Sequence, residues 1–133
     1  MANTTFTGPV RSENGFQSIT KSSTTGAVTV NSSYGKAATV GVQSLSGAGA
    51  VDVVNGLTSL TTTGSAQALT LADGTAGQIK MIVHAVDGGS AVLTPTTKIG
   101  FSTITFTAVG DSVTLVYTAT GWAVVGSKGV TIA

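Results

Sequence analysis

Few residues in this chain could take part in catalysis. It has one histidine, His84, no cysteine and five acidic residues. A Ser-His-Asp relay or a histidine-based metal site would therefore have to use His84. Alternate side chains of a strand share a face, so His84 falls on the same face as Lys80 and Ile82. We interpret His84 as a half-exposed strand histidine, and we expect no catalytic residue, no metal site, no cofactor and no enzymatic activity.

The acidic residues are also predicted to have structural rather than catalytic roles. No two of them have the spacing of a general acid and its base, and no EF-hand pattern is present. Convergence of separate aspartate loops on a calcium ion stays open as an alternative. A glycine pair at 47 and 49 lacks the lysine and the following helix of a phosphate loop. Four aspartates, mostly beside glycine, are predicted to form turns: Asp52, Asp73, Asp87 and Asp111.

Aromatic and threonine side chains suggest two binding roles. Tyr34, Tyr117 and Trp122 could offer a stacking platform to a receptor or sugar. Trp122 opens a strand directly after a turn, which favours the alternative that it closes one end of the core. Thr-x-Thr spacings recur irregularly along the chain, so we favour solvated strand faces over a flat array that orders ice.

The composition limits the partners. The chain has 133 residues and a mass of 13.0 kDa, and its formal net charge is +1. So small a charge argues against binding to nucleic acid or to an anionic membrane surface. Charged residues make up only 8% of the chain, against roughly 25% in an average soluble domain. We therefore expect neighbouring subunits to cover much of the surface.

No segment directs the chain into or across a membrane. The first residues lack the basic and apolar regions of a secretory signal, and no apolar stretch approaches the roughly 20 residues of a membrane helix. Without cysteine no disulfide framework is available. We expect a soluble protein that is synthesised in a cytoplasm.

The pattern of the chain is that of strands and turns. Period-two alternation and frequent glycine predict seven to nine short strands, hence an all-β fold, an antiparallel β-sandwich or barrel of jelly-roll-like type. Residues 103–126 are predicted to form a three-stranded meander. The other predicted strands cover residues 27–30, 38–43, 51–54, 68–71, 78–86 and 91–94.

The first 25 residues differ from the remainder. They contain few apolar side chains among threonine, serine and asparagine, with Gly8 and Pro9 in the middle. Such a segment cannot form a core of its own. We predict an extended N-terminal arm at residues 1–25 that orders on another surface, and a single β domain at residues 26–133.

Several stretches resemble a module of virion structural proteins of tailed phages, particularly marine ones. The resemblance covers about residues 1–16 and 65–129. It rests on the opening TTFTGPVRSENGF at residues 4–16, LTLADGTAGQIK at 69–80, GSAVLTP at 89–95, TITF at 103–106, GDSVTL at 110–115 and GWAVVG at 121–126.

The resemblance implies a non-enzymatic β-rich protein displayed on a particle, commonly as a homotrimer. We expect a capsid decoration (cement) protein on the outer surface of the phage head, with the major capsid protein as partner. A tail or head fibre module that binds a host receptor is the alternative. The docking segment would lie in the arm, against coat or a sister subunit, and the contact residues would include Thr4, Thr5, Phe6, Pro9, Val10, Arg11 and Phe16.

Overall fold

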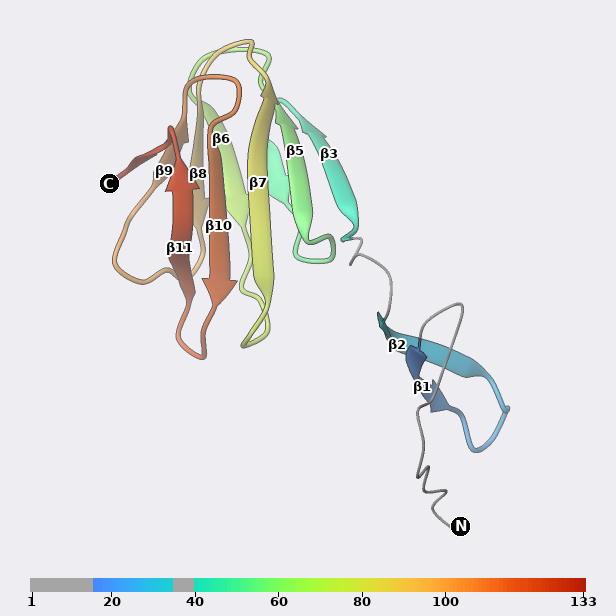
Figure 1. Cartoon of the computed structure of the whole chain (residues 1–133). Coiled ribbons are helices and arrows are strands. Elements are labelled where there is room, and N and C mark those ends of the chain that lie inside the picture. The colour runs from blue at the N-terminus through green and yellow to red at the C-terminus, as the bar shows by residue number, and fades with distance from the viewer. Residues whose placement is uncertain (1–15, 35–39) are drawn as a thin grey trace. The chain divides into compact units, whose positions relative to one another are not determined.

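The chain forms two compact units. The computed structural model describes residues 16–34 and 40–133, and its units are Met1–Thr39 and Val40–Ala133. In the first unit, β1 (Phe16–Lys21) and β2 (Val28–Tyr34) form an antiparallel hairpin with an irregularity between Ser18 and Ile19 (Figure 1). The division between the units thus falls after residue 39, whereas the sequence placed its boundary after residue 25.

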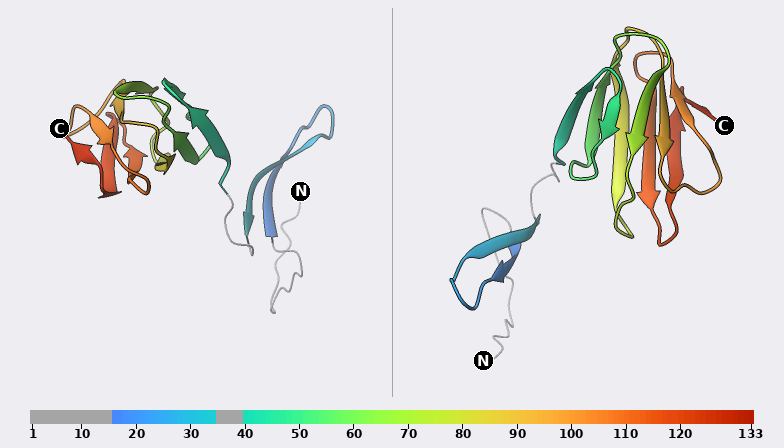
Figure 2. Two further views of the ribbon diagram at one scale, coloured as in Figure 1. Left: turned by 90° about the horizontal axis from the view of Figure 1, so that it is seen from above. Right: turned by 180° about the vertical axis from the view of Figure 1, so that it is seen from behind.

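The second unit is built from strands arranged in two layers (Figure 1, Figure 2). One five-stranded sheet has the order β11-β10-β7-β5-β3 and is called the front sheet here; the other has the order β12-β9-β8-β6-β4 and is called the rear sheet. The strands are β3 (Val42–Ser46), β4 (Gly49–Val51), β5 (Leu57–Thr61), β6 (Gln67–Leu71), β7 (Ile79–Val86), β8 (Ala91–Pro95), β9 (Ile104–Phe106), β10 (Ser112–Tyr117), β11 (Trp122–Lys128) and β12 (Thr131–Ile132).

The all-β, sandwich-like fold predicted from the sequence is confirmed, but the sheets are mixed rather than antiparallel. From β3 to β8 the chain crosses to the other sheet after every strand. Each strand from β3 to β6 therefore pairs in parallel with the strand two places later, as β3 does with β5 and β5 with β7. The rear sheet repeats this with β4, β6 and β8. The first half of the unit is thus a coil of stacked two-strand turns.

The second half closes the sandwich with antiparallel strands. β10 lies between β7 and β11, and the predicted hairpin of β10 with β11 is confirmed. The predicted meander is wrong in its first strand, because β9 pairs with β8 and β12 in the rear sheet. The turn at residues 107–111 carries the chain from one layer to the other. The uncharged strand β9 is consequently covered on both edges, as its composition demands.

The core lies between the two sheets. Ile104 and Phe106 of the rear sheet and Val113 and Leu115 of the front sheet are fully or almost fully buried, on the faces that the alternation predicted. Trp122 is also buried, and its indole Nε1 donates to the carbonyl of Ala72 at 2.8 Å. The sequence interpretation of Trp122 as a closing residue of the core is confirmed.

The buried indole yields a stability prediction. Replacing Trp122 by alanine removes a large buried side chain and orphans the Ala72 carbonyl, which should lower the free energy of unfolding by about 3–5 kcal/mol. Val125 of the same strand is 62% exposed, and its replacement by alanine should change the free energy by about 0.5 kcal/mol or less. Urea denaturation of both variants measures the difference, and equal losses would contradict this account of the core.

Candidate interaction surfaces and buried polar groups

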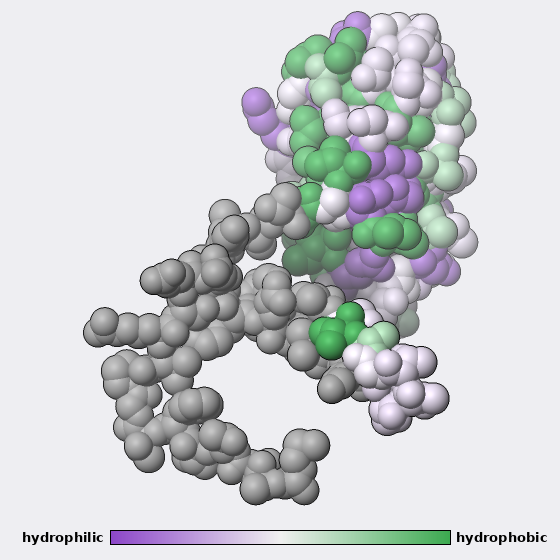
Figure 3. Space-filling view, turned by 90° about the vertical axis from the view of Figure 1, so that its right-hand side faces the viewer, coloured by the Kyte–Doolittle hydropathy of each residue, from purple (hydrophilic) through white to green (hydrophobic). Residues whose placement is uncertain are grey.

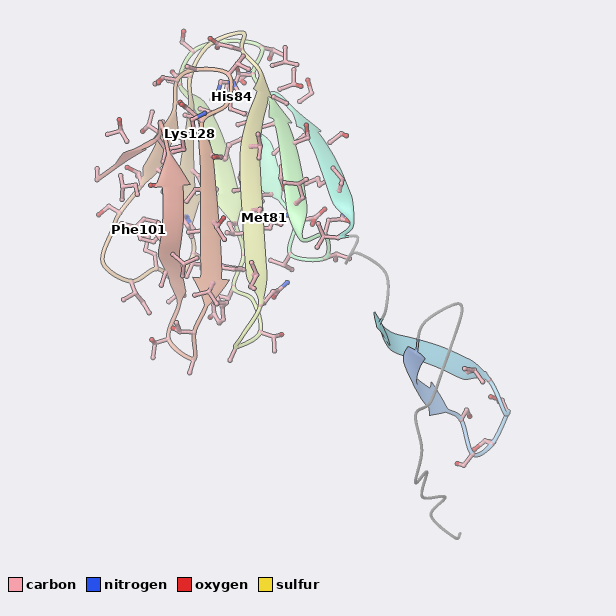
Figure 4. The ribbon with its side chains drawn as sticks, viewed as in Figure 1. Met81, His84, Phe101 and Lys128 are labelled. Atoms are coloured by element: carbon pink, nitrogen blue, oxygen red, sulfur yellow. The ribbon has the colours of Figure 1, made fainter. Side chains whose placement is uncertain are left out.

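His84 lies inside the sandwich at one end (Figure 4). Its Nε2 is 2.9 Å from the hydroxyl of Thr62, and its ring meets Phe106 edge-on with centroids 6.4 Å apart. The Thr62 hydroxyl donates to the carbonyl of Gly89 and accepts from the amide of Gly88, both at 2.8 Å. Because the Thr62 hydroxyl donates its one proton to Gly89, it must accept from His84. The imidazole therefore carries a proton on Nε2.

The buried histidine is poorly placed for catalysis. Its remaining nitrogen, Nδ1, is buried without a hydrogen-bond partner. The neighbouring Thr62 hydroxyl already makes three contacts and is itself buried, so it is not a free nucleophile. The half-exposed position predicted for His84 is wrong. Packing against Phe106 and bonding to Thr62 hold the imidazole inside, although the sharing of one face by His84, Ile82 and Lys80 is confirmed.

Lys80 is the second buried polar group of β7. Its Nζ donates to the carbonyl of Asn55 at 2.8 Å and lies 3.5 Å from a carboxylate oxygen of Asp52. Burial lowers the pKa of Lys80, and the nearby Asp52 charge opposes that shift only in part. Burial likewise pushes the pKa of Asp52 upward, but hydrogen bonds from Asn55 and the Lys80 charge outweigh it and leave that pKa below its ordinary value. The Lys80 ammonium is thus held by Asn55 and Asp52 of its own chain.

Asp111 organises the turn between β9 and β10. One carboxylate oxygen accepts from the amides of Thr107 at 2.8 Å and Ala108 at 3.0 Å. The Thr107 amide is the main cause that lowers the pKa of Asp111, against the opposing effect of burial. A side chain at residue 129 would collide with the same carboxylate, so Gly129, whose φ is +77°, is required there.

Asp87 serves as a turn residue, as predicted, since its carboxylate accepts from the amide of Gly89. The turn predicted at Asp73 is not formed by its side chain, which instead accepts from the amide and hydroxyl of the distant Thr97. Within residues 16–34 and 40–133, no three acidic, histidine or cysteine side chains gather as metal ligands would. The same part of the chain holds no helix with the length and apolar character that crossing a membrane requires.

Trp122 cannot take part in the stacking platform considered from the sequence. Tyr117 and Trp122 contact each other in a T-shaped pair with centroids 5.1 Å apart, and the indole has no exposed surface for a ligand. Tyr34 ends β2, where its backbone pairs with that of Phe16, the first residue of β1. The other predicted contact residues lie outside the described residues: Thr4, Thr5, Phe6, Pro9, Val10 and Arg11.

The threonines do not form a uniform ladder. On the outer face of the rear sheet, the strand register places Ala50 beside Thr70 and Thr70 beside Thr94. The next row includes Val92 and Thr105. Alanine and valine interrupt both rows, which suits the solvated strand faces that the sequence favoured.

The outer face of the front sheet mixes apolar side chains with serine and threonine, since Thr114 of β10 lies beside Met81 and Ser112 lies beside Val83. Met81 lies beside Leu57 on one side, and Val83 lies beside Ser59. Ile79 on the same face is 56% exposed. The outward positions of β3, β5, β7 and β10 carry no charge, and Lys128 lies beside Ser112 at a corner (Figure 4). We call this surface the front face. Sequence reasoning missed it because the alternation of β7 did not tell which of its two faces was buried.

Comparisons with known proteins do not assign the chain. No protein-family model matches it, and no curated protein matches it either.

The hydroxyl of Thr62 leads to a second stability prediction. Thr62→Val keeps the side-chain volume but removes three hydrogen bonds, so the buried imidazole of His84 and the backbone groups of Gly88 and Gly89 lose their partner. The free energy of unfolding should fall by about 2 kcal/mol or more. Thr62→Ser retains the hydroxyl and should recover most of that loss. Equal denaturation midpoints for the valine and serine variants would show that this network contributes nothing.

The lowered pKa of Asp111 leads to a prediction of how stability depends on pH. Its pKa in the folded protein lies below the ordinary value of 3.8, so its stabilising effect is complete above that pH and is lost as the pH falls through the folded-state value. Asp111→Asn should lower stability at neutral pH by about 1 kcal/mol and flatten the acid limb of the profile. Denaturation of both proteins from neutral to acidic pH measures this, and parallel profiles would contradict it.

Proposed function

We propose that this chain is a structural protein of a phage particle that attaches to the outside of the coat shell and stabilises it, without catalysing a reaction. The observation that carries the proposal is the front face, where Leu57, Met81 and Val83 lie outward while Lys80 and His84 lie inward. Exposed apolar surface is favoured once a partner removes it from water. The resemblance of residues 65–129 to phage virion proteins suggests that this partner is the major capsid protein.

The mode of attachment follows from the lack of charge. An uncharged apolar contact is not steered over long distances, and one such face has only a modest area. Five strands about 4.8 Å apart and about 20 Å long give roughly 400 Å², against roughly 800 Å² per partner in a standard interface. On a shell with many equivalent sites, linked copies, such as the expected homotrimer, raise the effective concentration of each further contact. Weak single contacts then hold firmly together.

The proposal is tested by adding the protein back to particles that lack it. Bare particles should release their genome at a lower temperature or under milder osmotic shock, and the added protein should restore their resistance. Met81→Lys places a charge at the middle of the front face and should reduce binding at least tenfold. Thr105→Lys, on the outer face of the rear sheet, is the matched control and should bind normally.

Two results would overturn the proposal. One is that bare and complete particles prove equally robust and equally infectious. The other is that Met81→Lys, shown by its thermal melt to be folded, restores resistance as well as the wild-type chain does.

A fibre module that binds a host receptor is the second candidate. The coil of stacked parallel strands from β3 to β8 favours it, because stacked turns can be extended into a shaft. Tyr34→Ala and Tyr117→Ala should then abolish adsorption to cells while particles still assemble. Trp122 is unsuitable for this test because it is buried. Normal adsorption of both variants would exclude the receptor role of these residues.

A further inference from the structure

Three polar side chains meet where the loop between β4 and β5 passes β7. The Nζ of Lys80 donates to the backbone carbonyl of Asn55 at 2.8 Å. One carboxylate oxygen of Asp52 lies 3.5 Å from the same Nζ, and the other accepts from the side-chain nitrogen Nδ2 of Asn55 at 2.8 Å. A single carboxylate thus contacts both the amine of Lys80 and the carboxamide of Asn55.

The surrounding chain fixes this arrangement. The backbone amide of Asn55 donates to Asp52 Oδ1 at 2.8 Å, and the amide of Asp52 donates to the Gln43 side chain at 2.9 Å. A Cβ at residue 41 would collide with the Asn55 carboxamide, so Gly41 leaves the room that this side chain occupies. Lys80 and Asn55 are therefore held together although they lie 25 positions apart in the chain.

The environment of Lys80 favours the neutral amine, which is the nucleophilic form of lysine. The Lys80 side chain is only 1% exposed, and burial lowers its pKa. The Asp52 side chain is 31% exposed, so a small product released beside it has a way out to solvent. Figure 3 looks onto the side of the sandwich that β3 and β4 border, and hydrophilic residues reach the surface there.

We propose that Lys80 and Asn55 become joined by an intramolecular isopeptide bond, with Asp52 transferring the proton. The neutral Nζ attacks Cγ of Asn55 and forms the new carbon–nitrogen bond. The Asp52 carboxylate takes one proton from Nζ and passes it to Nδ2. The bond between Cγ and Nδ2 then breaks, and ammonia leaves with the electron pair of that bond. A secondary amide remains, and the step involves no oxidation or reduction.

A competing reaction starts from the same asparagine. Attack on its Cγ by the backbone nitrogen of Gly56 would give a cyclic imide and would also release ammonia. The carbonyl of Gly56 accepts from the amide of Met81 at 2.8 Å, which holds this residue in the pairing with β7. The Lys80 amine, by contrast, already contacts the carboxylate that binds Nδ2. The geometry therefore favours the lysine as the nucleophile.

The cross-link would tie the loop before β5 to the middle of β7. Such a bond limits the conformations of the unfolded chain, as a disulfide does, and this chain has no cysteine to form one. The reaction takes place within one chain and needs no partner. The inference therefore goes beyond the proposed function and does not rest on it.

Mass spectrometry of the purified full-length chain tests the inference. After incubation at neutral pH, the wild type should be lighter than its sequence mass by one ammonia, about 17 Da. Trypsin does not cleave after an acylated lysine. The peptide that covers residues 37–98 should therefore stay uncut at Lys80 and carry the whole mass loss. A cyclic imide would leave Lys80 cleavable and place the loss on the peptide of residues 37–80.

Three variants should keep their full sequence mass: Lys80→Met, Asn55→Ala and Asp52→Asn. Lys98→Met is the matched control, because the Nζ of Lys98 also bonds a backbone carbonyl, that of Pro95, and this variant should still lose ammonia. A thermal melt shows whether each variant is folded. Asn55→Ala decides the matter if Lys80→Met unfolds, since Asn55 is only half-buried.

Three results would overturn the inference: a wild type that keeps its full mass after incubation, a mass loss with normal cleavage at Lys80, and a mass loss that persists in folded Asn55→Ala. Binding to particles is measured separately with variants of the front face. Failure of the cross-link therefore leaves the proposed function standing, and failure of the proposed function leaves the cross-link standing.

Discussion

The orientation of β7 is the constraint on which the remaining features depend. Its polar residues lie inside because the protein supplies partners there, a carbonyl of Asn55 for Lys80 and the Thr62 hydroxyl for His84. Burying a lysine or a histidine without such partners would be costly. Once these two face inward, strand geometry sends Ile79, Met81 and Val83 to the outer surface. The apolar residues that β7 contributes to the front face thus point outward because Lys80 and His84 are hydrogen-bonded inside.

The crossing of the chain between the sheets explains the parallel pairing of β3 to β8. Because each strand from β3 to β8 is followed by one in the opposite sheet, neighbours in a sheet run parallel and the structure grows as a stack. The edge strands are β11 and β12 at one end of the two sheets and β3 and β4 at the other. At the second end the Gln43 side chain bonds the carbonyl of Ala50 and the amide of Asp52.

Local patterns in the sequence were sufficient for much of the fold. The all-β class, the turns at Asp52, Asp87 and Asp111 and the inward faces of β9 and β10 were predicted correctly. The strand at residues 57–61 was missed because its serine and threonine residues weaken the alternation of apolar and polar side chains. β12 was missed because a strand of two residues is too short to show such an alternation. Parallel pairing could not be predicted, since it depends on where the chain goes after a strand ends. The contact residues of the first 11 positions and the homotrimer stay predictions.

The chain's residues alone determine that it forms short strands joined by turns that contain glycine and aspartate. These properties follow from the period of apolar residues and from backbone preferences, which act over a few neighbouring positions. Only the tertiary structure decided which face of β7 is buried and which sheet β9 joins. Those outcomes depend on contacts between residues far apart in the chain, such as Lys80 with Asn55 and His84 with Thr62.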